Sequence, residues 1–184
     1  MFRGLNLSER KLIKGFFSAK TGKVYVKDED AVKFLVEKGY GEKIENVVEL
    51  QPYEVLYLAY EGLLEVYDEE TGKRINEKEL LKIFSQQDRL TWSKYLVYRD
   101  LRKRGYVVKS GFGYGVDFRV YERGEYNKKA AKYLVCGIFE GEPIQIKTLM
   151  SILAGASNVK KEVILGVIER KGEVVYYSLS SFTP

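Results

Sequence analysis

The stretch YRDLRKRGYVVK, residues 98–109, followed after a short interval by GVDFRVY, residues 115–121, decides the fold of this chain. Its first part has apolar side chains at helical spacing and reaches Gly105, a residue type that commonly ends a helix. Two short apolar runs typical of strands come next. We therefore expect a helix that ends at Gly105, followed by strands over residues 106–108 and 116–121.

Further strands and one helix follow this stretch. Strand-like runs cover residues 133–139, 163–168 and 174–179, and a helical pattern covers residues 146–153. The order of helix, strands, helix and strands predicts a mixed sheet flanked by helices. Because no helix start directly follows the glycine-rich residues 111–115, we interpret them as a tight turn with close backbone approach rather than a phosphate-binding loop.

The first part of the chain alternates short strand-like runs with capped helices. One helix is expected to begin after Asp28, to end at Gly39 and to place Ala31, Phe34 and Leu35 on its apolar face. The pattern predicts three further elements, which are a helix over residues 52–62, a strand over 64–67 and a helix over 76–85.

A polar stretch at residues 85–89 interrupts two apolar-periodic segments and marks the expected domain boundary, which we place at residue 86. The fold class is then α+β or mixed α/β. A small amino-terminal α+β domain, residues 1–86, precedes a second domain, residues 87–184, with a mixed sheet flanked by helices. Thr91 is expected to cap the first helix of this second domain.

Charge and composition narrow the function classes. The chain has 31 Lys and Arg against 26 Asp and Glu, a net charge of +5, which favours a polyanionic partner but fits a solvated mixed-charge surface equally well. Its single cysteine, Cys136, lies in an apolar run and is expected to be a buried, inert thiol, without a disulfide or cysteine zinc site within one chain. No stretch has the length of a membrane span. We expect a cytoplasmic protein that needs no metal or cofactor.

Residues 98–121 resemble the signature of tRNA-splicing endonucleases of the archaeal type. The similarity covers about residues 90–184, and the turn at residues 39–41 suits the amino-terminal domain of that family. The resemblance implies that the second domain has the fold of the family's nuclease domain. Further matching pieces follow in the family's order, at residues 132–135, 157–161 and 176–177.

The resemblance implies metal-independent cleavage of precursor RNA at a bulge-helix-bulge fold, leaving a 2′,3′-cyclic phosphate and a 5′-hydroxyl. In that family a tyrosine is the base, a histidine is the acid and a lysine stabilises charge on phosphorus. By motif, the tyrosine is Tyr121 and the lysine is Lys161; without the resemblance they are a strand aromatic and a solvated charge. The histidine position, three residues before Tyr133, is Ala130, and the chain contains no histidine.

Two further positions depart from the family's catalytic subunits. Those subunits usually carry an arginine seven residues before the lysine and another fifteen after it, which clamp a bulge base by stacking. These positions are Ala154 and Tyr176 here, and a tyrosine keeps the ability to stack on a base. Three departures at functional positions favour a subunit that has no catalysis of its own.

We therefore expect a structural subunit, inactive alone, that joins a catalytic subunit in an α2β2 heterotetramer acting on precursor tRNA. The alternative is a catalytic subunit in which histidine was changed to alanine at position 130, because Tyr121 and Lys161 are intact; its assembly would be a homo-oligomer. A third reading, from another class, is a basic RNA-binding module without a nuclease partner.

The closing strand and the loop before it are the expected interface. Members of the family form dimers through this strand, and they join dimers by inserting the loop, usually acidic, into a basic groove of the opposite subunit. The loop at residues 169–173 carries two acids and two bases here, so docking would depend on its acids. The expected interface residues are Glu169, Glu173, Val174, Val175, Tyr176 and Tyr177.

RNA contact is expected from basic residues in two segments. One is the basic face of the helix that ends at Gly105, and the other is a lysine pair beside position 130. A solvated basic helix face is the alternative explanation. The expected RNA-binding residues are Arg99, Arg102, Lys103, Arg104, Lys128 and Lys129.

Overall fold

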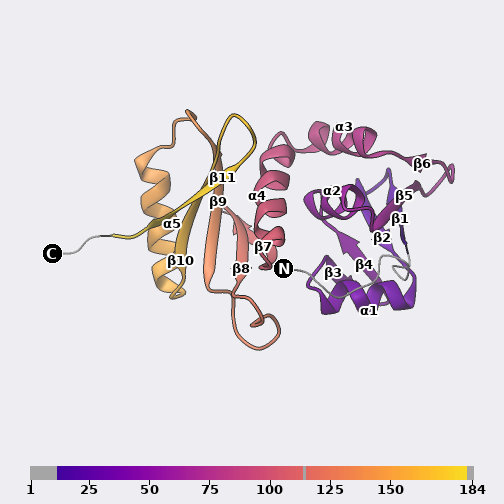
Figure 1. The fold of residues 1–184 in the computed structure, drawn as a ribbon, viewed down its shortest axis with the longest axis horizontal. Coiled ribbons are helices and arrows are strands. Elements are labelled where there is room, and N and C mark those ends of the chain that lie inside the picture. The colour runs from indigo at the N-terminus through magenta and orange to yellow at the C-terminus, as the bar shows by residue number, and fades with distance from the viewer. Residues whose placement is uncertain (1–11, 114, 182–184) are drawn as a thin grey trace. The chain divides into compact units, whose positions relative to one another are not determined.

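The structure is a computed structural model of the 184-residue chain, and it describes residues 12–113 and 115–181. Contacts between Cα atoms divide the chain into two compact units, with the boundary after Thr91 (Figure 1). The polar stretch at residues 85–89, expected to mark the domain boundary, is partly helical, because α3 (Glu77–Gln87) extends into it. One residue of the glycine-rich interval, Tyr114, lies outside the described residues.

The first unit is an α+β unit built on a six-stranded sheet in the order β3-β4-β2-β1-β5-β6. The β1–β5 pair is parallel and the other pairs are antiparallel. Its helices are α1 (Glu29–Glu37), α2 (Pro52–Tyr60) and α3. The strands are β1 (Ile13–Ser18), β2 (Lys23–Val26), β3 (Glu42–Ile44), β4 (Val47–Leu50), β5 (Leu64–Asp68) and β6 (Arg74–Ile75).

Helix α1 begins where the sequence predicts, but one residue of its expected apolar face is exposed. Asp28 caps it by accepting a hydrogen bond from the Ala31 amide at 2.9 Å, as expected. The prediction for Phe34 is wrong, since that side chain is 38% exposed. The buried arc runs from Ala31 through Leu35 to Val32, and Phe34 lies at its margin.

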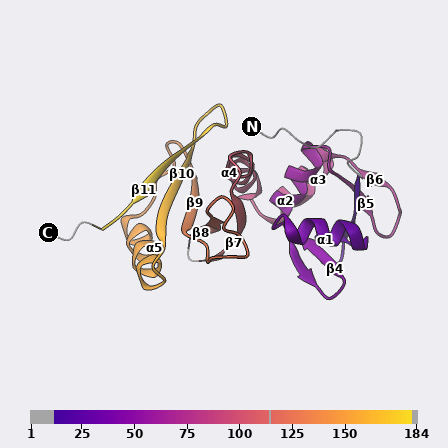
Figure 2. The same cartoon turned by 60° about the horizontal axis from the view of Figure 1, so that its bottom comes forward.

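The second unit has a five-stranded sheet in the order β11-β10-β9-β8-β7. The β9–β10 pair is parallel and the other pairs are antiparallel, so the expected mixed sheet is confirmed. Helices α4 (Thr91–Lys103) and α5 (Ile146–Asn158) lie on its two sides (Figures 1 and 2). The strands are β7 (Val107–Gly113), β8 (Val116–Tyr121), β9 (Tyr133–Phe139), β10 (Glu162–Ile168) and β11 (Val174–Leu179).

Two glycines let α4 pack closely on the sheet. A Cβ at Gly137 would lie 3.0 Å from Cγ2 of Val97, and one at Gly166 would lie 3.6 Å from the same atom. Val97 is fully buried there. Glycines at these two strand positions therefore make room for the helix. The prediction that Thr91 caps α4 is wrong, since it is the first residue of the helix and its hydroxyl donates to the Phe84 carbonyl at 3.1 Å.

Helix α5 covers the other face with a compact apolar cluster. Its Ile152 and Ala156 pack against side chains of β9 and β10, including Leu134, Cys136 and Val163. Cys136 is 3% exposed, so the expected buried thiol is confirmed. Burial raises the pKa of this thiol to about 12, which keeps it protonated and unreactive at neutral pH.

The β7–β8 hairpin contains a place where only glycine fits. A Cβ at Gly111 would lie 2.1 Å from the Val116 carbonyl oxygen, closer than any side chain tolerates. The register of the two strands shifts between Ser110 and Gly113. This confirms the close backbone approach expected for the glycine-rich interval, and the hairpin irregularity explains it.

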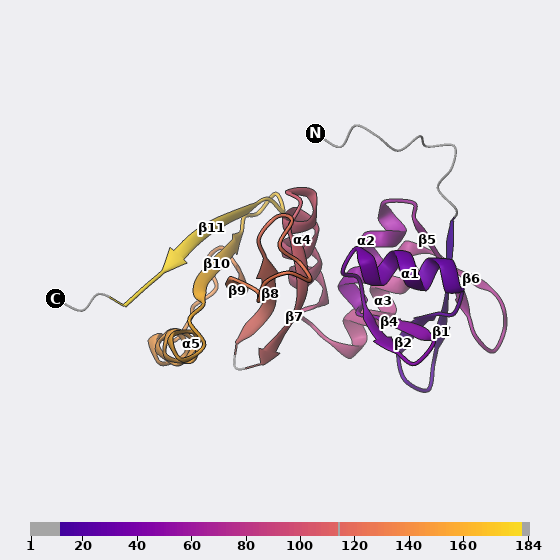
Figure 3. The ribbon, with the colours of Figure 1, turned by 90° about the horizontal axis from the view of Figure 1, so that it is seen from below.

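Strand β11 forms one edge of its sheet, as expected for the closing strand, and pairs with β10 (Figure 3). Its side chains alternate between two environments. Val174 is buried and Tyr176 is half-buried against the unit, whereas Val175 and Tyr177 are 38% and 54% exposed. The outward pair is therefore the part of the strand that is open to a partner.

Candidate RNA-cleaving site

Sheet topology brings three chain segments to one edge of the second unit. Because β8 is antiparallel to β9 and β9 is parallel to β10, the end of β8 lies beside the starts of β9 and β10. Val120 and Glu162 both pair with Tyr133, from opposite sides. Tyr121, which follows Val120, and Lys161, which precedes Glu162, therefore flank the segment that enters β9.

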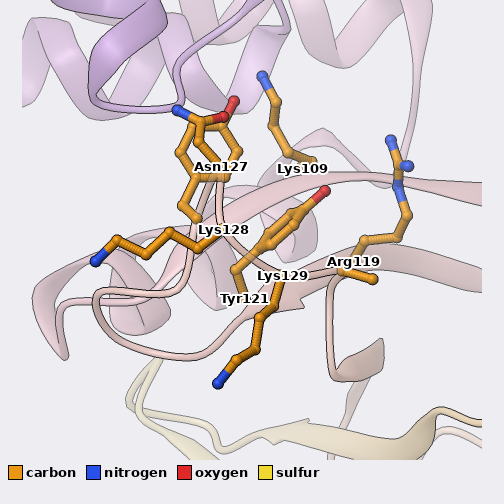
Figure 4. Close-up of a pocket in the computed structure, with 8 residues that line it drawn as sticks. Lys109, Arg119, Tyr121, Asn127, Lys128 and Lys129 are labelled. Atoms are coloured by element: carbon orange, nitrogen blue, oxygen red, sulfur yellow. The ribbon is translucent and has the colours of Figure 1, made fainter.

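An open hollow of about 420 Å³ lies at this edge (Figure 4). Tyr121 and Ala130 both line it, so the structure brings together the tyrosine and the position that lacks histidine. Four of the eight lining residues are cationic and none is acidic, which favours an anionic ligand. The lining residues are Lys109, Arg119, Tyr121, Tyr126, Asn127, Lys128, Lys129 and Ala130.

The loop between β8 and β9 closes one side of the hollow through its own contacts. Lys129 pairs with Glu125 at 3.0 Å, and Lys132 pairs with Glu122 at 3.1 Å. The hydrogen bond from Lys132 lowers the pKa of the Glu122 carboxyl, which therefore stays ionised. The ring of Tyr126, in the same loop, meets Tyr121 edge to face with centroids 5.1 Å apart. These contacts hold the loop against the end of β8.

The end of α5 places Lys161. Lys160 has a left-handed backbone, with φ of 51°, and the Lys161 amide turns back to the Ala156 carbonyl at 3.0 Å. The Lys161 ammonium donates to the Ala131 carbonyl, next to Ala130. Lys161 therefore borders the hollow without lining it, and the three positions converge through the backbone of the segment that enters β9.

The amino acids around the hollow define which steps they can support. Tyr121 offers a phenol, and the surrounding ammonium and guanidinium groups offer fixed positive charge for a phosphate. Ala130 contributes a methyl group, which transfers no proton. Within residues 12–113 and 115–181, no group of three or more Asp, Glu, Cys and His side chains is arranged to hold a metal ion.

Comparison with known proteins gives the family. The sequence model of the tRNA intron endonuclease catalytic C-terminal domain matches residues 91–176, and that of the family's N-terminal domain matches residues 17–81. The chain belongs to the tRNA intron endonuclease family. The resemblance of residues 98–121 is thereby confirmed, and so is the two-part fold of a small α+β region and a mixed-sheet unit.

Several archaeal relatives called tRNA-splicing endonuclease match over most of both chains. The relative from Methanococcus vannielii is 36% identical over 157 residues, which are 85% of this chain and 88% of that protein. The relative from Thermococcus kodakarensis is 34% identical over 85% of this chain and 92% of its own. That from Pyrococcus abyssi is 32% identical over 92% of this chain and 96% of its own.

The hollow of this family member contains four lining residues that sequence reasoning missed, namely Lys109, Arg119, Tyr126 and Asn127. The signal for two of them was present. Arg119 precedes Tyr121 by two residues on one strand and therefore points to the same face. Lys109 is paired directly with Arg119 across β7 and β8, which only the strand register shows.

Three of the four basic residues expected to bind RNA from α4 have contacts within their own unit. Arg99 donates to the Gly172 carbonyl at 3.1 Å, and so ties the helix to the loop before β11. Arg102 lies within 3.5 Å of the Tyr106 carbonyl, and Arg104 pairs with Asp100 at 2.6 Å. Lys103 and Arg104 are exposed, and RNA contact by this helix stays a prediction.

Tyr176, at the position of the second clamping arginine, faces the interior of its unit. The guanidinium of Arg104 lies 5.4 Å from its ring centroid, and its ring contacts the place that a Gly166 side chain would take. Burial raises the pKa of its hydroxyl. The ring is therefore held by contacts within its own unit. Ala154, at the first clamping position, is exposed on α5.

Proposed function

We propose that this chain is a subunit of a tRNA-splicing endonuclease that excises introns at bulge-helix-bulge sites in precursor tRNA. Membership of the tRNA intron endonuclease family supports this substrate, as do the cations around the hollow. The observation that carries the proposal is the convergence at one sheet edge of Tyr121, Lys161 and Ala130. The proposal takes Tyr121 and Lys161 as two of the three groups that cleavage needs, and an alanine stands at the third position.

The chemistry follows from the cleavage products, which are a 2′,3′-cyclic phosphate and a 5′-hydroxyl. A base takes the proton of the ribose 2′-hydroxyl, the 2′-oxygen attacks phosphorus, and an acid gives a proton to the departing 5′-oxygen. Tyr121 is the candidate base, and Lys161 is the candidate charge stabiliser for the pentacoordinate phosphorus. The proton donor is missing at Ala130. Loss of general acid catalysis alone slows such a step by about 10²- to 10⁴-fold.

We therefore assign this chain a non-catalytic, structural role beside a catalytic subunit that supplies the complete set of groups. The departures at Ala154 and Tyr176 support this role, because Tyr176 is packed against Arg104. The chain alone is expected to leave a bulge-helix-bulge RNA intact. Mixed with its catalytic subunit, it is expected to form a heteromeric complex that cleaves the same RNA.

Substitution Ala130→His tests whether the rest of the site is competent. The new imidazole would face the hollow beside Tyr121, so cleavage of a bulge-helix-bulge RNA should rise by about 10²- to 10⁴-fold over the parent chain. The measurement is the single-turnover rate, with product ends identified by their chemistry. The double variant A130H/Y121F is the control and should return to the parent rate. A folded A130H chain that binds this RNA without cleaving it contradicts the assignment of Tyr121 and Lys161.

The second candidate is a catalytic subunit in which histidine was changed to alanine at position 130. The retained positions of Tyr121 and Lys161 favour it, because a subunit released from catalysis has no need of either. The codon at position 130 of the natural gene decides between the two, since a histidine codon there removes the structural role. If the chain neither joins a catalytic subunit nor supports cleavage, it is an RNA-binding module instead.

A further inference from the structure

We propose that the β7–β8 hairpin holds one nucleotide of the RNA, with Phe112 stacked on its base and Arg119 and Lys109 bound to its phosphate. The inference rests on the proposed function, because it takes the polyanionic ligand to be the RNA that the enzyme cleaves. It adds a base-binding and a phosphate-binding element that lie outside the catalytic positions.

Phe112 is a large apolar side chain in an unusual place. It lies in the hairpin at the edge of the sheet, and 55% of it is exposed. The Arg119 guanidinium lies 4.8 Å from its ring centroid, so a cation and an aromatic ring are stacked at the surface. Exposed aromatic rings beside cations are typical of surfaces that bind unpaired nucleotides, because every base has a face that stacks.

Arg119 and Lys109 supply the charge for the phosphate. They are directly opposite each other across β7 and β8, and both line the hollow. The Arg119 Nε–H donates to the Ser110 carbonyl at 2.8 Å, which fixes the plane of the guanidinium and leaves its terminal nitrogens for a phosphate. Side chains on paired strands are held more firmly than side chains on a loop, so this pair is preorganised for binding.

The direction of the side chains separates this pair from the two loop lysines. Figure 4 shows the Tyr121 hydroxyl on the side toward which Lys109 and Arg119 project, whereas the ammonium end of Lys128 projects sideways and that of Lys129 projects the opposite way. Lys129 is also paired with Glu125. A phosphate held by Lys109 and Arg119 would therefore lie near the Tyr121 hydroxyl, and its base would reach Phe112.

Fluorescence anisotropy with two labelled RNAs, a bulge-helix-bulge RNA and an oligouridine, tests the inference over a range of salt concentrations. K109Q and R119Q each remove the positive charge of one phosphate contact, so binding of both RNAs should weaken about 3- to 20-fold. The slope of log affinity against log salt concentration should become shallower by about 0.7 to 0.9. Removing the ring in F112A should weaken both by about 5- to 100-fold with an unchanged slope, since stacking carries no counterion. F112Y keeps the ring and should bind like the parent chain.

Lys82→Gln is the matched control, because it removes one exposed positive charge from α3, far from every residue assigned to RNA contact in the sequence, and should change binding by less than about twofold. F112A and K109Q binding within twofold of the parent chain would overturn the inference. So would an equal loss in K82Q, or a parent chain that binds neither RNA. Thermal unfolding of each variant separates a binding defect from a folding defect. R119K is the conservative variant, which keeps the charge of Arg119 but not its stacking.

The oligouridine also separates this inference from the proposed function. It measures the nucleotide site without any requirement for splicing or a partner subunit. Losses in K109Q, R119Q and F112A, together with failure to support cleavage beside a catalytic subunit, would leave the nucleotide site standing and reject the splicing role. Unchanged binding in these variants, together with cleavage by the mixed complex, would reject the nucleotide site and leave the splicing role standing.

Discussion

Two small side chains in the second unit, Ala130 and Cys136, have opposite relations to solvent. Ala130 is exposed at the rim of the hollow, where its methyl group leaves Tyr121 beside positive charge without a partner for proton transfer. Cys136 is buried under α5, where burial keeps its thiol neutral. Ala130 therefore matters for the chemistry of the site. Cys136 matters for packing and for how the stability of the fold depends on pH.

The thiol of Cys136 should make the folded state sensitive to alkaline pH. Its folded pKa of about 12 lies above the ordinary value of 9.0, because burial disfavours the thiolate. The folded state therefore holds this proton more tightly, and the resulting stability is complete below pH 9 and is lost as pH rises toward 12. Over that interval the free energy of unfolding, measured in urea, should fall by up to about 1.4 kcal/mol per pH unit more in the parent chain than in C136A.

The comparison with C136A removes the effect of other titrating groups, since the tyrosines and lysines are common to both chains. C136A should be less stable at pH 8, because it loses buried sulfur contacts. Its free energy of unfolding should then approach that of the parent chain at higher pH. Parallel pH profiles for the two chains would show that the thiol does not titrate on unfolding in this interval.

Among the elements, the β7–β8 hairpin carries the side chains of the proposed nucleotide site and contains one position that only glycine fits. It presents Lys109, Phe112 and Arg119, and its register depends on the close approach at Gly111. Helix α5 contrasts with it. Gly155 of α5 is exposed, and a Cβ there would have no neighbour within 4 Å beyond the backbone of its own helix, so the helix gains nothing from that glycine.

Alanine should therefore have opposite effects at these two glycines. G111A would place a Cβ 2.1 Å from the Val116 carbonyl oxygen, and the hairpin would have to shift at a cost of about 2–3 kcal/mol. G155A should raise the free energy of unfolding by about 0.5–1 kcal/mol, since alanine loses less backbone entropy in a helix. Urea unfolding of both variants measures the difference. Equal effects would mean that the close approach at Gly111 does not constrain the hairpin.

At the scale of the whole molecule, the exposed edge of β11 and the loop before it are the surfaces proposed for assembly. Val175 and Tyr177 point outward from the edge strand, and Glu173 is exposed in the loop. The loop is held in place, because the Glu169 amide donates to the Glu173 carbonyl at 2.8 Å and Arg99 binds the Gly172 carbonyl. Its position is thus fixed by the unit that carries it.

None of the helices within the described residues has the length and apolar character needed to span a membrane.

Charge reversal in this loop tests how the proposed assembly forms. If Glu169 and Glu173 dock into a basic groove of the opposite subunit, E169K/E173K should change the tetramer to dimers, because like charges brought together cost several kcal/mol. Native mass determination by light scattering measures the change. E70K/E140K, which reverses two exposed acids elsewhere, is the matched control and should leave the tetramer intact. A tetramer that survives E169K/E173K rejects this docking.

Local patterns predicted most of the elements, since the information lies within short windows of sequence. The start of α1 after Asp28, the strand over residues 174–179 and the close backbone approach at Gly111 all depend on neighbours along the chain. The wrong prediction for Phe34 has a different origin. Helical periodicity defines an arc of the surface, but only the packed sheet decides where that arc ends.

By itself, the sequence determined the family, the order of the elements in the second unit and the absence of histidine, because motifs and composition need no three-dimensional partner. Only the tertiary structure decided that Tyr121 and Ala130 share a hollow with Lys109 and Arg119, and that Arg99 and Arg104 have contacts within their own unit. The physical reason is strand pairing. Register joins residues far apart in the chain, and a hairpin irregularity such as the one between Ser110 and Gly113 shifts which side chains meet.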